Sequence, residues 1–422
     1  MKPYPKYKDS GIEWLGVVPE GWSVKSVWHI FSLGRGRVIS HEFIMDNPGD
    51  YPVYSSQTED HGILGYLDSF DFEGDYITWT TDGANAGTVF RRLGKFNCTN
   101  VCGTLKAKYD GLTDNAFMAY SLSNATAEFV RYDINPKLMN NVMASIKVPC
   151  PSIIEQHAIA SFLDRETARI DALISKKERM IELLKEKRIA LITQAVTKGL
   201  DPNAKMKDSG IEWLGEVPEH WKTTKVGFGY SIQLGKMLQP EPDKPSDIPV
   251  KYLKAVNVQW DEITVDEDSL MWASINDLSK YRIQCGDLLV CEGGEAGRAA
   301  MLEFEVGDLI IQNALHRVRS SKNNVRYLQF LLQVASNHGW FDIVCNKATI
   351  AHFTRDKFSA LQIPYPPITE QDLIVRHIQH LCQNTKLTIA KIIDSITFLR
   401  EYRSSLIHSA VTGKIDLRDY HD

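Results

Sequence analysis

Basic and polar side chains gather in two stretches of the chain, each after an acidic stretch. Residues 42–82 contain ten Asp and Glu and no Lys or Arg, and residues 91–108 contain five Lys and Arg and no acid. Residues 241–308 carry fifteen acids against six basic residues, and residues 317–357 carry seven basic residues against two acids. Cationic side chains bind phosphate oxygens, and Arg, Asn, Gln and His hydrogen-bond to base edges. One such stretch would favour a merely solvated face, but the repeated order supports nucleic-acid binding equally well.

The residue patterns that catalysis needs are not found in the sequence. GGEAGRA at 293–299 is the nearest match to a phosphate-binding P-loop, but it lacks the lysine and the hydroxyl. IPYPPI at 363–368 is not the Asn/Asp-Pro-Pro-Tyr/Phe motif of adenine methyltransferases, and neither a HExxH zinc pattern nor a GxSxG elbow occurs. The sequence therefore predicts a binding and assembly protein that is not itself an enzyme and holds no metal.

The chain repeats itself, which places the basic stretches in two similar halves. KYKDSGIEWLGVVPEGW at 6–22 returns as KMKDSGIEWLGEVPEHW at 205–221, with fourteen of seventeen positions identical. A second pair, VPCPSIIEQH and IPYPPITEQD, begins at residues 148 and 363. The offset is 199 for the first pair and 215 for the second, so the second variable region is 16 residues longer.

Two long helices are expected after the second pair of segments. No Pro or Gly interrupts residues 152–198 or 368–412. Apolar residues in both stretches follow the alternating spacing of three and four that is typical of a coiled-coil seam. Such a helix needs a partner for its apolar stripe, and the other copy is the obvious one; the alternative is two unrelated core helices. The predicted packing residues are Ile174, Ile181, Leu184, Leu191, Ile389, Ile396, Leu399 and Leu406, with Arg188 and Arg403 inside the seams.

The regions between the repeated segments are rich in Gly, Asn, aromatic and β-branched residues, which predicts short strands joined by loops. We therefore expect a mixed α/β fold. The predicted segments are a first domain at 1–150, a central helix at 151–200, a second domain at 201–364 and a distal helix at 365–422.

Composition limits the class of protein. A chain of 422 residues is too long for one core. Its net charge of -5 excludes binding through bulk positive charge but not a local basic face. Seven scattered cysteines without a CxxC pair predict free thiols in a reducing cytoplasm, and we expect no signal peptide and no membrane span.

The repeated segments also resemble a known family. KDSGIEWLGxVPxxW, at 8–22 and 207–221, looks like the opening of target-recognition modules in specificity subunits of type I restriction-modification systems. IPYPPITEQ and its degenerate partner VPCPSIIEQ resemble the Pro-rich entry to that family's conserved helices, and LITQAVTKG and LIHSAVTGK resemble the helix ends. The likeness spans the whole chain, although the variable regions match only in general pattern.

The resemblance implies two globular target-recognition domains separated by two long antiparallel coiled-coil helices with pseudo-two-fold symmetry. Each domain would read one half of a split, asymmetric double-stranded DNA site, and the helices would set the spacer. Two methyltransferase subunits and restriction subunits would join this chain. S-adenosylmethionine, ATP and Mg²⁺ would belong to those partners, with no cofactor on this chain.

Candidate DNA-contacting residues are the polar side chains in or near the basic stretches. In the first domain they are Arg35, Gln57, Asn85, Arg91, Arg92, Lys95 and Asn97. In the second they are Arg298, Gln312, Asn313, His316, Arg317, Arg319, Lys347 and Arg355. Two other functions stay open: a stand-alone methyltransferase or nuclease with an unrecognised site, and a coiled-coil scaffold that binds only proteins. The Trp-Leu pairs at residues 14–15 and 213–214 either pack against the domain or face a methyltransferase.

Overall fold

A computed structural model describes residues 2–132, 135–266, 268–345, 352–418 and 420. The chain divides into two compact units, one of residues Met1–Glu178 with Ile393–Asp422 and the other of Arg179–Ile392. This division cuts through both long helices, so each helix contributes to both units. The four predicted segments instead separate each domain from the long helix that follows it, and these boundaries stay a prediction.

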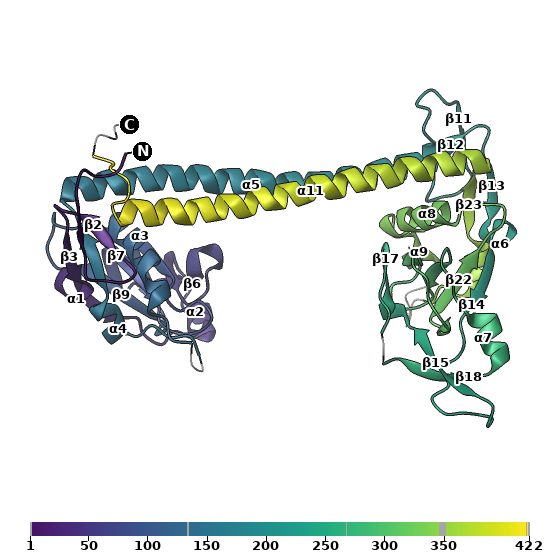
Figure 1. The fold of residues 1–422 in the computed structure, drawn as a ribbon, viewed down its shortest axis with the longest axis horizontal. Helices are drawn as coiled ribbons and strands as arrows, with labels where there is room; N and C mark the ends of the chain where they lie inside the picture. The colour runs from purple at the N-terminus through teal and green to yellow at the C-terminus, as the bar shows by residue number, and fades with distance from the viewer. Residues whose placement is uncertain (1, 133–134, 267, 346–351, 419, 421–422) are drawn as a thin grey trace. The chain divides into compact units, whose positions relative to one another are not determined.

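The first unit is built on a six-stranded sheet that α3 covers (Figure 1). The strand order is β4-β9-β7-β8-β5-β6, antiparallel except for the parallel pair β5–β8. These strands are β4 (Phe31–Arg35), β5 (Tyr51–Tyr54), β6 (Ile63–Leu67), β7 (Phe72–Thr80), β8 (Val89–Cys98) and β9 (Cys102–Ala107). Two small pairs accompany them, β1 (Tyr7–Asp9) with β2 (Val17–Pro19) and β3 (Ser23–Ser26) with β10 (Lys147–Cys150). The short helices are α1 (Val27–Ile30), α2 (His41–Asp46), α3 (Asn115–Ala125) and α4 (Asn140–Ser145).

The second unit repeats this plan with smaller sheets. Its strand orders are β14-β22-β19-β20 and β18-β15-β21, with the pairs β11–β12, β13–β23 and β16–β17. The strands are β11 (Met206–Asp208), β12 (Glu216–Pro218), β13 (Lys222–Lys225), β14 (Ser231–Leu234), β15 (Ile248–Leu253), β16 (Val258–Gln259), β17 (Glu262–Ile263), β18 (Leu270–Ala273), β19 (Leu288–Cys291), β20 (Ala299–Met301), β21 (Leu309–Ile311), β22 (Leu315–Arg319) and β23 (Gln362–Tyr365). The helices are α6 (Val226–Gly229), α7 (Ile275–Tyr281), α8 (Val325–Asn337), α9 (Trp340–Val344) and α10 (Arg355–Ala360).

The two long helices are α5 (Ile153–Lys198) and α11 (Ile368–Val411), close to the predicted ranges. Within the first unit, Arg403 Nε lies 2.9 Å from a carboxylate oxygen of Asp171, and Arg400 Nη2 lies 3.0 Å from Glu178. Within the second unit, Arg188 of α5 and Cys382 of α11 line one cavity. The start of each helix therefore pairs with the end of the other, which confirms the predicted mixed α/β fold with an antiparallel helix pair.

The predicted seam residues differ in burial from their neighbours on the same helices. Ile174, Ile396 and Leu406 are buried, and the other five are partly buried. Leu173 and Ile189, which lie off the seam, are each 40% exposed. This pattern is what a shared apolar stripe produces. Of the Trp-Leu pairs, both leucines are buried and both tryptophans are partly buried, so the leucines at least pack inside their own units.

Candidate nucleic-acid interface

In each unit, a glycine that follows the first strand of the main sheet bonds to a neighbouring backbone segment in the same way. We call this arrangement the backbone junction. The amide of Gly36 donates to the carbonyl of Cys102 at 3.0 Å, and the amide of Gly235 donates to that of Leu315 at 2.9 Å. A Cβ added at either glycine would lie 2.2 Å from a backbone carbonyl oxygen, so only glycine fits. The two variable regions thus share a scaffold that their sequences show only faintly.

A loop crosses this junction in both units. It follows β7 in the first unit, where the amide of Thr81 donates to the carbonyl of Val101 at 2.8 Å. In the second unit it follows β19, and the amide of Glu292 donates to that of Ala314 at 2.9 Å. We call the neighbouring loops of the first unit the first loop edge; they are residues 35–37, 82–87 and 99–101. Those of the second unit form the second loop edge, which consists of residues 236–239, 293–298 and 312–314.

Arg35 of the first loop edge and Lys137, which lies outside it in the sequence, pair with the same carboxylate. Arg35 and Lys137 lie 3.6 and 3.8 Å from the carboxylate oxygens of Asp82. Arg35 also donates through Nε to the carbonyl of Asn100. All these side chains keep 30–52% of their surface exposed, so solvent weakens the ion pairs and a phosphate could compete for the cations.

The amide side chains near the first loop edge brace the loops. Asn85 Nδ2 donates to the carbonyl of Ser56 at 2.9 Å, and Gln57 Nε2 donates to the carbonyl of Ile63. Both are partly buried. Asn85 holds the segment between β5 and β6 against the loop that follows β7, and Gln57 closes that segment on itself.

The second loop edge carries different chemistry on the same junction. Lys236 pairs with Asp277 at 3.0 Å. Arg298 pairs with Glu295 at 3.1 Å and donates to the carbonyl of Ala255 at 3.0 Å. Gln312 and Asn313 are partly buried beside them.

Three candidates form ion pairs within their own sheets. Arg91 forms a bidentate pair with Asp75, with a shortest N···O distance of 2.7 Å, and Arg319 makes the same type of pair with Asp287. Hydrogen bonding to the carboxylate raises the pKa of Arg91 and of Arg319. Lys95 lies 3.8 Å from Glu73 across the β7–β8 ladder.

Arg92 and Asn97 are interior residues of the first unit. Arg92 is 5% exposed, and its guanidinium carbon lies 3.6 Å from the centroid of the Tyr54 ring. Burial lowers the pKa of Arg92. Asn97 is fully buried and donates to the carbonyl of Ser69 at 2.7 Å. Both side chains make their contacts inside the first unit.

His316 is also fully buried, and it has a counterpart in the first unit. Its Nε2 lies 2.8 Å from the carbonyl oxygen of Phe353, so Nε2 carries the proton. The position matching His316 is Gly103, and a Cβ there would lie 2.2 Å from the ring of Trp79. Trp79 Nε1 donates at 2.9 Å to the carbonyl of Leu138, which occupies the place of Phe353. In the two domains, corresponding backbone carbonyls thus accept a hydrogen bond from aromatic rings that lie on different strands.

The remaining candidates all come from the second half of the sequence. Arg317 is partly buried and donates to the carbonyl of Arg282, and Arg355 is exposed at the start of α10. Lys347 lies outside the described residues. Asp82, Lys137 and Lys236 were not among the predicted residues, because the ion pairs that they form join distant parts of the chain.

The glutamine of the repeated Glu-Gln pair was not among the predicted residues either. Gln156 and Gln371 are 2% and 0% exposed. Gln156 accepts from the amide of Asp114 at 2.9 Å, and Gln371 accepts from that of Asn324 at 3.0 Å. Their repetition in both copies was the available signal. Each ties the start of a long helix to the start of α3 or α8.

The family of the chain follows from comparison with known proteins. The family model described as type I restriction modification DNA specificity domain matches residues 19–183 and 251–397. The chain belongs to this family. Among the described residues no helix is long and apolar enough to cross a membrane, and no group of three or more His, Cys, Asp or Glu could hold a metal ion.

Relatives with type I specificity names match parts or most of the chain. A putative specificity subunit N-terminus of Mycoplasma pneumoniae is 47% identical over 136 residues, 32% of this chain and 72% of the relative. A second from the same organism is 38% identical over 135 residues, 32% of this chain and 44% of its own length. The MjaVIII specificity subunit of Methanocaldococcus jannaschii is 23% identical over 386 residues, 86% of this chain and 87% of that protein.

Solved structures share the fold. A chain from a study of complex assembly and conformational transition of the type I restriction-modification system aligns with a TM-score of 0.64 at 14% identity, covering 94% of this chain and 99% of that one. The HsdS subunit from Thermoanaerobacter tengcongensis aligns with a TM-score of 0.56 at 13% identity, covering 94% and 98%.

Proposed function

We propose that this chain reads a split, asymmetric double-stranded DNA site, with one half of the site on each loop edge. The observation that carries the proposal is the shared backbone junction with different polar side chains on it. A common scaffold presents both loop sets in one way, while Asn85 on one and Arg298 and Gln312 on the other select different bases. The two half-sites therefore differ in sequence.

The contacts divide by exposure. Arg35 and Lys137, which share the Asp82 carboxylate, exchange it for DNA phosphates, as Lys236 does with Asp277. The amides at the loop edges reach base edges. The interior candidates Arg92, Asn97 and His316 hold the scaffold without touching DNA, and Arg91, Lys95 and Arg319 stay paired with the carboxylates of their own sheets.

The chain acts in this proposal as a non-catalytic cytoplasmic subunit. Two methyltransferase subunits and restriction subunits assemble on it, and they bring S-adenosylmethionine, ATP and Mg²⁺. Family membership and the fold shared with a chain from the type I complex support this assembly. The net charge of -5 suggests that tight binding needs the partners to complete the DNA-facing surface.

Footprinting with the methylation subunits tests the proposal. We expect two protected half-sites separated by an unprotected spacer. Arg35→Ala should lower affinity roughly 5- to 100-fold, the loss of one DNA contact worth about 1–3 kcal/mol. Arg91→Ala, which removes a pair to Asp75, is the matched control and should change affinity less than about twofold. One contiguous footprint, or equal losses in the two variants, would contradict the proposal.

A further inference from the structure

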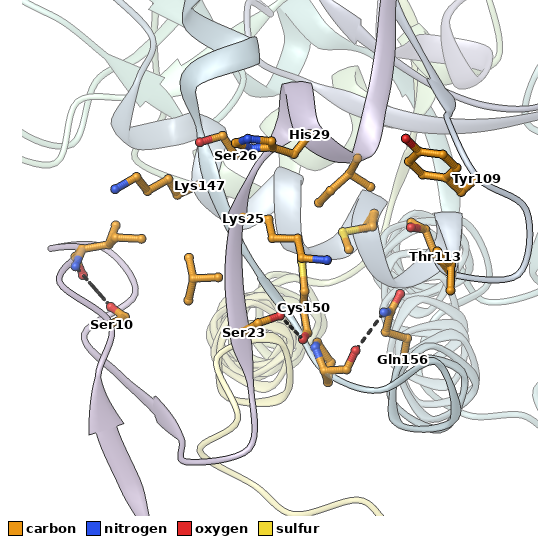
Figure 2. Close-up of a pocket in the computed structure, with 16 residues that line it drawn as sticks. Ser10, Ser23, Lys25, Ser26, His29, Tyr109, Thr113, Lys147, Cys150 and Gln156 are labelled. Carbon is orange, nitrogen blue, oxygen red and sulfur yellow. Dashed lines mark hydrogen bonds between the residues drawn. The ribbon is translucent and has the colours of Figure 1, made fainter.

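A groove in the first unit is lined by the short strand β3. The cavity has a volume of about 760 Å³, and all four residues of β3 line it. Among the described residues, β3 pairs with β10 alone, so its other edge is unpaired. The cavity is also lined by Ser10 and Ile12 of the loop between β1 and β2, by Lys147 and Cys150 of β10, and by the segment from Tyr109 to the start of α3 (Figure 2).

The pairing register shows which backbone groups face the groove. Val27 donates to the carbonyl of Ile146 at 2.9 Å, just beyond the paired residues of β3 and β10. Bonded and non-bonded pairs alternate along an antiparallel ladder, so Lys25 and Ser23 bond to β10. Val24 and Ser26 then direct their N–H and C=O groups to the open edge, and Val24 stands opposite Pro149, which has no N–H to offer.

The lining of the groove is cationic and partly apolar. Lys25, Lys147 and His29 contribute to it, and none of the lining residues is an Asp or Glu (Figure 2). Ile12 and Leu112 are among its apolar members. An open strand edge offers main-chain hydrogen bonds to an added strand, and the neighbouring side chains select its sequence.

The second unit does not repeat this lining. In the matching register Thr224 stands in place of Lys25 and Gln362 in place of Lys147, whereas Lys222 and Lys225 stand in place of Ser23 and Ser26. The second unit thus carries its lysines at other positions of the strand, and a partner that recognises the arrangement around β3 binds once per chain. We propose that the β3 edge of the first domain binds one extended acidic segment of a partner protein, which adds to β3 as a strand.

A peptide-binding measurement on the full chain tests this proposal. The ligand is a fluorescein-labelled ten-residue peptide of alternating Glu and Val, and binding is followed by fluorescence anisotropy. Lys25→Glu with Lys147→Glu should weaken binding at least tenfold, and Val24→Pro, which removes one outward N–H, should also weaken it. Thr224→Glu with Gln362→Glu, the matched change in the second domain, should leave affinity within twofold. Thermal unfolding identifies any variant that fails to fold.

Three further measurements separate the peptide from other occupants. The same peptide N-methylated at alternate residues should bind at least tenfold more weakly, because it loses the bonds to the strand edge. Hydrogen exchange at residues 23–26 should slow when the unmodified peptide is added. Equal binding of the N-methylated peptide, unchanged exchange at β3, or tighter binding of a ten-residue oligothymidylate through the same lysines would overturn the proposal.

Discussion

At the scale of single residues, the two domains satisfy one backbone acceptor in two ways. Trp79 and Gly103 are paired on neighbouring strands of the first unit, and Val290 and His316 occupy the corresponding positions in the second. The indole and the imidazole each donate an N–H to the corresponding carbonyl. A large ring on one strand accompanies a small residue on its neighbour, which conserves core volume. A polar residue in a basic stretch can therefore belong to the core, as His316 does.

His316→Ala should lower the free energy of unfolding by about 1–3 kcal/mol, because the carbonyl of Phe353 loses its buried donor. Burial also lowers the pKa of His316 below its ordinary value of 6.5. The unfolded chain then binds a proton that the folded chain does not, so stability is present above pH 6.5 and falls as the pH drops below it. Urea denaturation between pH 5 and 8 measures both effects. A variant with an unaltered pH dependence would show that another group is responsible.

The exchanged rings should also be energetically coupled. Trp79→Val or Gly103→His alone should destabilise the first domain, the first by leaving a cavity and the second by a clash with the indole. The double variant reproduces the arrangement of the second domain and should be more stable than the sum of the single effects implies. A double-mutant cycle from urea denaturation gives the coupling. Simple additivity would mean that the two arrangements are unrelated.

At the scale of elements, each long helix is fastened to its domain at its first turn. Gln156 accepts from the amide before α3 and donates to the carbonyl of Pro151 at 3.0 Å. Gln371 makes the same two bonds in the second unit, donating to Pro366 at 2.9 Å. One buried side-chain amide thus fixes the direction in which the helix leaves the domain. The same glutamine occurs in both copies of the repeated segment.

Gln371→Ala should cost about 1–3 kcal/mol of stability, because the amide of Asn324 is left buried without an acceptor. Gln371→Glu keeps that acceptor but loses the donor to Pro366, so we expect it to be destabilising as well. His157→Ala removes an exposed contact with Asp114 in the first unit and should have a smaller effect, because solvent weakens that contact. Denaturant titration of all three measures the order. Equal effects for the buried and exposed positions would refute the role of the amide.

Elements with a strong local signal could be predicted from the sequence. The two helices follow from unbroken three-and-four spacing: α5 begins one residue after the start of the Pro- and Gly-free stretch 152–198, and α11 ends one residue before the end of the stretch 368–412. The loop edges could not be predicted, because they depend on contacts such as Arg35 with Asp82 that join distant parts of the chain. The basic stretches did not show how their side chains are held: Arg91 and Arg319 pair with carboxylates of their own sheets, which a charge count does not reveal.

At the scale of the whole molecule, the long helices are the parts that both units share. Residues 153–178 of α5 belong to the first unit and residues 179–198 to the second, and α11 is divided in the same way. Each domain is fastened to these helices by its buried glutamine. Under the proposed function, the helix length therefore sets the number of base pairs between the half-sites.

Insertion of four residues into both helices tests this dependence. Insertions within 174–195 of α5 and within 389–406 of α11 keep the antiparallel seams aligned, and four residues add about 6 Å at 1.5 Å per residue. Since DNA rises about 3.4 Å per base pair, the preferred spacer should lengthen by about two base pairs while the half-site sequences stay the same. Selection of bound sequences from a random library, with the methylation subunits present, measures both quantities. An insertion in α5 alone misaligns the seam and should reduce stability without giving a defined new spacer. Altered half-sites with an unchanged spacer would show that the helices do not set the distance.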